Sequence, residues 1–268
     1  MILQLFLLFS LALTSPLRAE TVRIAVTTSF HNSGLHDVLL PALEADTGID
    51  VQLLVVGTGQ ALRLGRAGDV DALLVHAPPL EAAFVAEGFA PYRLPVMQND
   101  FVIAGPLDDP AGVQATTNTV DAFARILGVG EEGEAAFVSR GDDSGTHAAE
   151  LAIWRDADLV PNGRWYKSVG AGMGAALNVA SGLGGYVLTD RASWLAFGNR
   201  EGLRILHEGD PVLHNPYAYL PISAERHPHV ARDAAERVGA WLVSDRARAL
   251  IDGYRIDGAR LFAPAPRP

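Results

Sequence analysis

Cysteine is missing from this 268-residue chain. Its absence excludes disulfide bonds, thiolate metal ligands and a lipid anchor on an N-terminal cysteine. Basic residues are also few, because 21 Lys and Arg residues stand against 31 Asp and Glu residues, for a formal net charge of −10 at pH 7. An acidic chain without a basic run is a poor nucleic-acid binder, so we expect no nucleic-acid partner.

A hydrophobic run long enough to cross a bilayer is missing as well. Residues 1–14 are almost wholly apolar, but the run breaks at Ser15 and Pro16 and is too short to span a membrane with any margin. The small residue Ala19 then suits the cleavage site of a secretory signal peptide. The sequence therefore predicts a cleaved signal peptide over residues 1–19, with a membrane anchor or a core helix as the alternatives.

The rest of the chain alternates strand-like and helix-like runs, which is typical of an α/β fold. Strands are expected at 22–26, 51–56, 72–75, 101–104, 136–138, 185–188 and 217–222. Helices are expected at 34–46, 60–66, 80–87, 119–127, 144–157, 175–181 and 230–243. We expect two lobes, one made of residues 20–104 and 208–268 and the other of residues 105–207, with crossovers near 99–106 and 204–216.

The polar segment from Ser139 to His147 is the most informative stretch of the sequence. It places Arg140 and three hydroxyls beside two glycines, directly before an apolar-periodic run that predicts a helix beginning near Ser144. A helix start offers unpaired N–H groups and the positive end of the helix dipole, and arginine adds a planar fork of donors. The segment therefore predicts a site for a small anion.

Two other turns have the same character. Thr27-Thr28-Ser29 ends the expected strand at 22–26, and Gly57-Thr58-Gly59 follows the expected strand at 51–56. Three polar strand-to-helix turns predict that one anion is held by donors that converge from all three.

Two other interpretations of the segment 139–147 stay open at this point. In the first, Arg140 forms a salt bridge with Asp142 or Asp143 on a surface loop, and Ser144 only caps the helix. In the second, a hydrolase uses Ser144 as nucleophile and His147 as base. A helix-cap serine rarely aligns for attack with a residue one turn on, and the chain has no Gly-x-Ser-x-Gly elbow.

Histidine does not form a convincing metal site in this sequence. The eight histidines are scattered, and only His227 and His229 lie close together, without nearby acids. We therefore expect no metal ion with direct protein ligands.

The chain strongly resembles the tungstate-binding proteins of bacterial ABC importers, a branch of the type II periplasmic binding proteins. The resemblance extends over nearly the whole mature chain. It rests on Thr27-Thr28-Ser29, Ser33-Gly34-Leu35, Leu39-Leu40-Pro41, Val56-Gly57-Thr58-Gly59-Gln60-Ala61-Leu62, Gly68-Asp69-Val70-Asp71, Val75-His76-Ala77-Pro78, Met97-Gln98-Asn99-Asp100-Phe101, the Ser139–His147 segment, Trp165-Tyr166, Gly172-Met173-Gly174 and Leu188-Thr189-Asp190-Arg191.

This resemblance implies two α/β lobes joined by two hinge strands, with the ligand in the cleft between them. The ligand residues that it implies are Thr28, Ser29 and Thr58 from the first lobe, and Ser139, Arg140, Ser144, Gly145 and Thr146 from the second. The implied function is a periplasmic receptor that captures tungstate, and also molybdate, and hands it to an ABC permease in the inner membrane. We accordingly expect a monomer that needs no cofactor and catalyses no reaction.

The chemistry of such a ligand sets a further expectation. A tetrahedral dianion has no hydrogen to donate at neutral pH, so the site should present donors only. Asp69, Asp142 and Asp143 should therefore point away from the ligand and fix the loops or Arg140. The alternatives are a receptor for phosphate, sulfate or a small organic acid, a sensing module without a transporter, and a secreted serine hydrolase.

Overall fold

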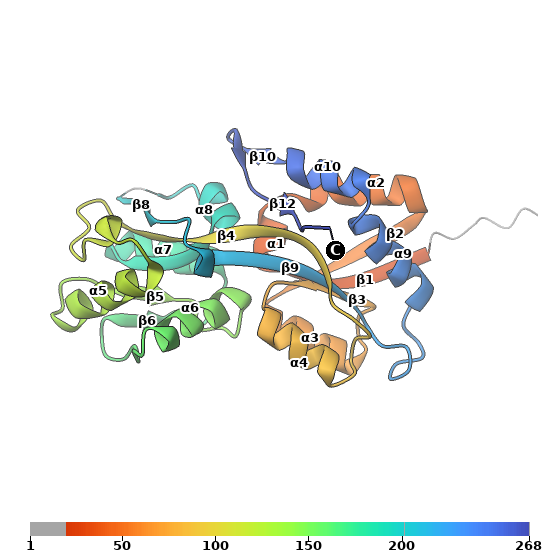
Figure 1. Cartoon of the computed structure of the whole chain (residues 1–268), viewed down its shortest axis with the longest axis horizontal. Coiled ribbons are helices and arrows are strands. Elements are labelled where there is room, and N and C mark those ends of the chain that lie inside the picture. Colours follow the sequence, from red (N-terminus) through yellow and green to blue (C-terminus); the bar gives the residue numbers. More distant parts are fainter. Residues whose placement is uncertain (1–19, 201, 268) are drawn as a thin grey trace, which may run out of the picture.

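The computed structural model describes residues 20–200 and 202–267, so the expected signal peptide lies outside the described residues. Within this part of the chain, ten strands form one sheet, with β8 and β12 paired on β4 beside the path β2-β1-β3-β9-β4-β7-β5-β6 (Figure 1). The strands are β1 Glu20–Thr27, β2 Ile49–Val56, β3 Ala72–Val75, β4 Leu94–Pro106, β5 Phe137–Ser139, β6 Tyr166–Ser168, β7 Tyr186–Asp190, β8 Leu203–His207, β9 His214–Pro221 and β12 Ala263–Pro264, and the separate pair β10 Arg255–Ile256 and β11 Ala259–Arg260.

Helices cover both faces of this sheet. They are α1 Thr28–Asn32, α2 His36–Thr47, α3 Thr58–Ala67, α4 Pro78–Ala86, α5 Thr119–Glu131, α6 Gly145–Asp156, α7 Met173–Leu183, α8 Arg191–Ala196, α9 Arg232–Leu242 and α10 Asp245–Gly253, with 3-10 turns at Val113–Ala115 and Pro211–Leu213. None of the helices in the described residues is long and apolar enough to cross a membrane.

The hydrophobic core is divided between two halves of the molecule. With the exception of Ala192, the buried residues of two clusters come from residues 20–97 and 217–267, which we call the first half. The buried residues of the other two clusters come from residues 101–213, which we call the second half. Figure 1 shows the two halves side by side, with β4 and β9 running from one into the other. The expected lobe boundaries at 104–105 and 207–208 stay a prediction.

Strand β1 illustrates why the apolar runs of the first half become strands. It pairs in parallel with β2 on one side and with β3 on the other. Val22, Ile24 and Val26 pack into one core cluster, whereas Ala25 packs into another, so successive side chains are buried on opposite faces of the sheet. A parallel strand covered on both faces must be apolar throughout, which is the pattern that residues 22–26 have.

All seven strands and seven helices expected from the sequence are present; most ends shift by a few residues, but β4 begins at Leu94, well before the expected start at 101. The helix expected at 34–46, for example, spans His36–Thr47 and ends at Gly48 in the left-handed conformation, at φ 70°. The sequence pattern did not predict the helices α1, α8 and α10 or the strands β6, β8, β10, β11 and β12; α1 and α8 are only five and six residues long. Short helices carry too few turns for an apolar period to be recognised.

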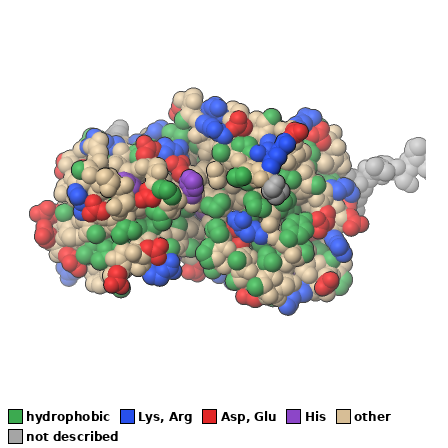
Figure 2. All heavy atoms as spheres, viewed as in Figure 1, with side chains coloured by type: hydrophobic (Ala, Val, Ile, Leu, Met, Phe, Trp, Pro, Cys, Tyr) green, Lys and Arg blue, Asp and Glu red, His purple; other side chains and the backbone are tan. Residues whose placement is uncertain are grey.

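Charged side chains are mixed over the surface. Figure 2 shows acidic and basic groups interspersed on one face of the described residues, with no continuous basic stripe there. This face therefore carries no concentrated basic patch of the kind that nucleic-acid binding needs.

Candidate oxyanion site

Three polar turns lie at the carboxyl ends of strands and lead directly into helices. Thr27 ends β1 and caps α1, and Gly57 follows β2 and caps α3. These two turns are neighbours, because Thr27 pairs with Val56 in the parallel ladder. In the second half, β5 ends at Ser139, and Ser144 caps α6 a few residues later. Each helix start presents unpaired N–H groups and the positive end of its dipole at the turn that precedes it.

Contacts between the two halves bring these turns together. The Gly59 N–H donates to the carbonyl oxygen of Asp143 at 3.1 Å, which joins the start of α3 to the loop before α6. A Cβ atom on Gly57 would lie 4.0 Å from Cα of Ser144, so that loop lies directly against the α3 turn. The turn that carries Thr58 and the loop that carries Ser144 therefore lie against each other, as donors converging from both halves require.

Buried donors without partners are concentrated among the predicted ligand residues. Five of the eight predicted ligand residues carry a buried side-chain atom that has no hydrogen-bond partner among the described residues. These atoms are Thr28 Oγ1, Thr58 Oγ1, Ser139 Oγ, Arg140 Nε and Thr146 Oγ1. Leaving one such group unsatisfied costs about 1–3 kcal/mol. Because all five can donate and they come from both halves, the arrangement suits a small ligand that accepts hydrogen bonds on every side.

Arg140 is held in place by its neighbour Asp142. The guanidinium Nη2 donates to Asp142 Oδ2, and Asp142 Oδ1 accepts from the backbone N–H of Ser144 at 3.3 Å. Asp142 thus fixes both Arg140 and the loop, as expected for this carboxylate. The salt bridge of the alternative interpretation is therefore present, but Arg140 is only 3% exposed rather than on the surface, and its Nε stays available.

Ser144 caps α6 as expected, and its hydroxyl oxygen accepts from the backbone N–H of His147 at 3.1 Å. This bond uses a lone pair and leaves the hydroxyl proton free to donate. Within the described residues, no hydrogen bond joins this hydroxyl to the imidazole of His147, which the hydrolase interpretation would require.

The hydroxyl of Ser29 behaves differently from the other candidates. It lies 3.0 Å from Thr27 Oγ1, 3.2 Å from His76 Nε2 and 3.0 Å from the hydroxyl of Tyr217. The residue is 1% exposed. Ser29 stays a predicted ligand residue through its backbone N–H at the start of α1, whereas its side chain is already engaged.

His76 and Tyr217 are residues of the site that sequence reasoning missed. His76 stood in the sequence only as a scattered histidine and as part of the resemblance segment Val75-His76-Ala77-Pro78, without a role of its own, and Tyr217 only as the beginning of a strand. Ser29, their neighbour in the site, is 47 and 188 positions away along the chain, so the spacing of residues could not show that they contact it. Burial lowers the pKa of His76 to about 4, so its ring is neutral at pH 7.

Two acidic side chains lie near the second-half turn. Burial raises the pKa of Glu150 to about 7, and hydrogen bonds from Tyr166 and Trp154 offset part of this rise. The Ser139 hydroxyl is close enough to lower that pKa as well, although it makes no hydrogen bond of normal geometry within the described residues. Burial also raises the pKa of Asp190, while the N–H of Ser193 and the charge of Arg140 hold it down. Partial neutralisation of these acids limits the repulsion that an anion would meet.

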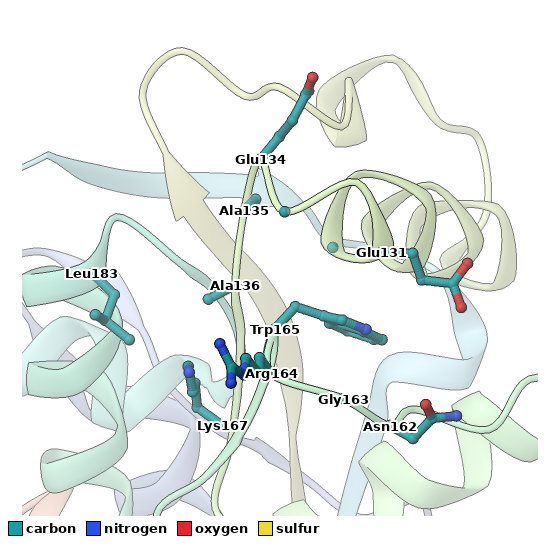
Figure 3. A pocket seen from close by; sticks show the side chains of 12 residues that line it. Glu131, Glu134, Ala135, Ala136, Asn162, Gly163, Arg164, Trp165, Lys167 and Leu183 are labelled. Atoms are coloured by element: carbon teal, nitrogen blue, oxygen red, sulfur yellow. The ribbon is translucent and has the colours of Figure 1, made fainter.

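Two cavities lie near or beside the second-half turn, and only one of them touches a predicted ligand residue, Ser144. One of about 440 Å³ lies between α3 and α4 on one side and α6 on the other, and Gly59, Asp143 and Ser144 line it. A separate cavity of about 570 Å³ lies in the second half and includes none of the predicted ligand residues. Figure 3 shows Trp165 extended across it between Arg164 and Glu131, so charges of both signs surround it.

Metal ligands do not gather anywhere in the described part of the chain. No group of three or more His, Asp or Glu side chains there could hold a metal ion. The donors of the candidate site are hydroxyl, guanidinium and amide groups, which suit an anion.

Comparisons with known proteins agree with this chemistry. The PBP superfamily domain matches residues 14–246. The tungstate-binding protein TupA of Peptoclostridium acidaminophilum is 39% identical over 248 residues, which cover 91% of this chain and 85% of that protein.

Two solved structures have the same fold. The tungstate-binding protein TupA from Desulfovibrio alaskensis G20 matches with a TM-score of 0.79 and 40% identity, over 93% of this chain and 100% of that one. The tungstate ABC transporter protein from Geobacter sulfurreducens matches with a TM-score of 0.80 and 42% identity, over 88% of this chain and 99% of that one. The fold class and the family resemblance expected from the sequence are thus confirmed, and the chain belongs to the PBP superfamily and to the branch that contains these tungstate-binding proteins.

Proposed function

We propose that this protein is a periplasmic receptor that binds tungstate, and also molybdate, and delivers it to an ABC permease in the inner membrane. The observation that carries the proposal is the set of five buried donors without partners, contributed by both halves of the molecule. The relatives described above, which are named for tungstate binding, support the choice of ligand.

The binding chemistry follows from the donor set. Arg140 supplies the one full positive charge among the predicted ligand residues, and a charge-assisted hydrogen bond contributes about 1.5–3 kcal/mol. The hydroxyls of Thr28, Thr58 and Thr146 each have a proton that no described residue accepts, and the starts of α3 and α6 add backbone N–H groups. A fully deprotonated dianion accepts from all of them without needing an acceptor in return.

Contacts from both halves would couple binding to closure. A ligand that bridges the halves binds the closed arrangement better than an open one and shifts the population toward it. We propose that the halves are the two lobes of a clamshell, that β4 and β9 are its hinges, and that the permease recognises the closed monomer. No cofactor and no catalytic step enter this function, and the leader at residues 1–19 would direct export.

The first prediction concerns ligand choice. Calorimetry on protein stripped of ligand should give strong binding of tungstate and molybdate and little or no binding of sulfate, because the larger anions fill the site. A saturating ligand at 100 times its dissociation constant should also raise the unfolding free energy by about 2.7 kcal/mol. Tight binding of phosphate or sulfate with no response to tungstate would identify a different receptor, and no response to any of them would refute the oxyanion function.

The second prediction concerns Arg140. Arg140→Ala should weaken tungstate binding at least about tenfold, because a charge-assisted bond of about 1.5–3 kcal/mol is lost. Arg140→Lys should restore only part of the affinity, since lysine keeps the charge but lacks the planar fork. Arg155→Ala is the control, because that arginine is exposed near the other end of α6. Equal affinity in the Arg140→Ala and Arg155→Ala proteins would remove Arg140 from the site.

The third prediction separates binding from stability. Thr58→Val removes a buried hydroxyl that has no partner, so the stability of the ligand-free protein should not fall, whereas tungstate affinity should drop about tenfold. Thr119→Val is the matched control, because the Thr119 hydroxyl donates to Asp210 at 2.9 Å and is buried. That variant should lose about 1–3 kcal/mol of stability and keep its affinity. Chemical denaturation and calorimetry measure the two effects, and the reverse pattern would contradict the assignment of Thr58.

The fourth prediction concerns pH. Glu150, with its pKa raised to about 7, becomes negatively charged as the pH rises and then repels a dianion held near Ser139. Tungstate affinity should therefore fall severalfold between about pH 6 and about pH 8, with proton uptake on binding near pH 7. Because the folded-state pKa lies above the unfolded value, the contribution of Glu150 to stability is also lost as the pH rises through about 7. Glu150→Gln should flatten both profiles, and exposed Glu134→Gln should not; identical profiles in both variants would exclude Glu150 as the titrating group.

A further inference from the structure

Strands β4 and β9, which run between the two halves, are connected to the start of α1 by a buried series of hydrogen bonds. Asn215 on β9 donates from Nδ2 to Oδ1 of Asn99 on β4 at 2.7 Å, and its own Oδ1 lies 2.8 Å from Nδ1 of His76. The other ring nitrogen, His76 Nε2, lies 3.2 Å from the hydroxyl of Ser29. These four residues are at most 7% exposed, so water gives them little help, and of their side-chain polar atoms only Asn99 Nδ2 has no partner among the described residues.

The direction of these bonds determines the tautomer of His76. The Asn215 amide gives its N–H to Asn99, which leaves its carbonyl oxygen, an acceptor only, facing His76 Nδ1. That nitrogen must therefore carry the single proton of the neutral ring. The other nitrogen, Nε2, is then bare and can only accept, so the Ser29 hydroxyl donates to it.

The hydroxyl of Ser29 is saturated by these contacts. It has one proton and two lone pairs to share. The proton goes to His76 Nε2, and the lone pairs face the hydroxyls of Tyr217 and Thr27, each 3.0 Å away. In contrast, Oγ1 of the adjacent Thr28 has no partner among the described residues. Of the two neighbouring hydroxyls in this turn, that of Ser29 is therefore fully engaged within the protein, whereas that of Thr28 is free to donate to a ligand.

The same ring is also the surface on which α6 rests. A Cβ atom on Gly145, the first residue of α6, would lie 2.7 Å from His76 Cε1 and 2.9 Å from the His76 carbonyl oxygen. Real Cβ atoms do not approach so closely, and a backbone oxygen cannot move aside as a flexible side chain can. His76 thus touches the α1 turn through Ser29 and the start of α6 through Gly145.

We propose that His76 is a positioning residue of the oxyanion site, and that it withholds the Ser29 hydroxyl from the ligand, so that the side-chain donor of the α1 turn is Thr28. This inference rests on the proposed oxyanion function. By binding Asn215 on one side and Ser29 on the other, His76 ties the α1 turn to β9, and by contacting Gly145 it sets how closely α6 approaches. The separation between donors of the two halves, and with it the size of the anion, depends on this ring.

The tautomer can be measured directly. Ring nitrogen chemical shifts of ¹⁵N-histidine-labelled full-length protein, with and without tungstate, should show a protonated Nδ1 and a bare Nε2 for His76 in both states. Asn215→Leu should remove this preference and identify the His76 signals. A protonated Nε2 in the unaltered protein would overturn the proposal, because Ser29 would then keep its proton for the ligand.

Substitutions in the α1 turn separate the two hydroxyls. Ser29→Ala should lower the melting temperature, since His76 and Tyr217 lose a buried partner, and should weaken tungstate binding less than Thr28→Val does, because it removes only one of the two links through which His76 positions the α1 turn. Thr28→Val should leave the melting temperature of the ligand-free protein unchanged and weaken binding at least about tenfold, as expected for a hydrogen bond to a charged group. Equal losses of affinity in the two variants would overturn the assignment of Ser29.

A pair of His76 variants tests the positioning role. His76→Phe keeps a flat ring against Gly145 but removes both hydrogen bonds, and should weaken tungstate binding at least about tenfold. His76→Gln restores an acceptor for Ser29 and should recover most of that loss, which general damage to packing would not produce. Affinity unchanged in both would overturn the positioning role. If the unaltered protein bound no oxyanion, the proposed function would fail by itself, and the ring-nitrogen measurement would still decide where the Ser29 proton lies.

Discussion

A buried hydrogen-bond donor must have a partner, and this requirement organises the structure around its candidate site. Thr28, Thr58, Ser139, Arg140 and Thr146 each carry a buried polar side-chain atom that has no hydrogen-bond partner among the described residues. Such groups oppose folding and closure unless something supplies the acceptors. A small oxyanion has acceptors on every side and no proton to give, so under the proposed function it would supply the missing acceptors.

Electrostatics at the site is local rather than global. The chain carries a formal net charge of −10, which opposes anion binding at long range. Three helix starts and one buried guanidinium act against this field, and Asp142 cancels part of the arginine charge while it fixes the orientation. Burial lowers the pKa of His76 and raises the pKa of Glu150, which keeps the surroundings of the anion close to neutral. Selectivity between anions then depends on the distances between the hydrogen-bond donors, and the packing of the two halves sets these distances.

That spacing is maintained by contacts that lie behind the donors. Gly59 bonds to the loop before α6, and Gly145 lies against His76, so neither position has room for a larger side chain without moving the halves apart. Asn215 and Asn99 link His76 to β4 and β9, the strands that run between the halves. Any change in the relative position of the halves therefore acts on the same residues that orient the α1 turn.

The sequence alone determined the α/β fold, the polar turns after β1, β2 and β5, and the cap of α6 at Ser144, because each depends on residues only a few positions apart. It could not distinguish Thr28 from Ser29, since both are hydroxyls in one turn. The tertiary structure made that distinction by placing His76 and Tyr217 beside Ser29, from 47 and 188 positions away. A hydrogen bond depends on atoms within about 3 Å of each other, and only folding decides which distant segments come that close.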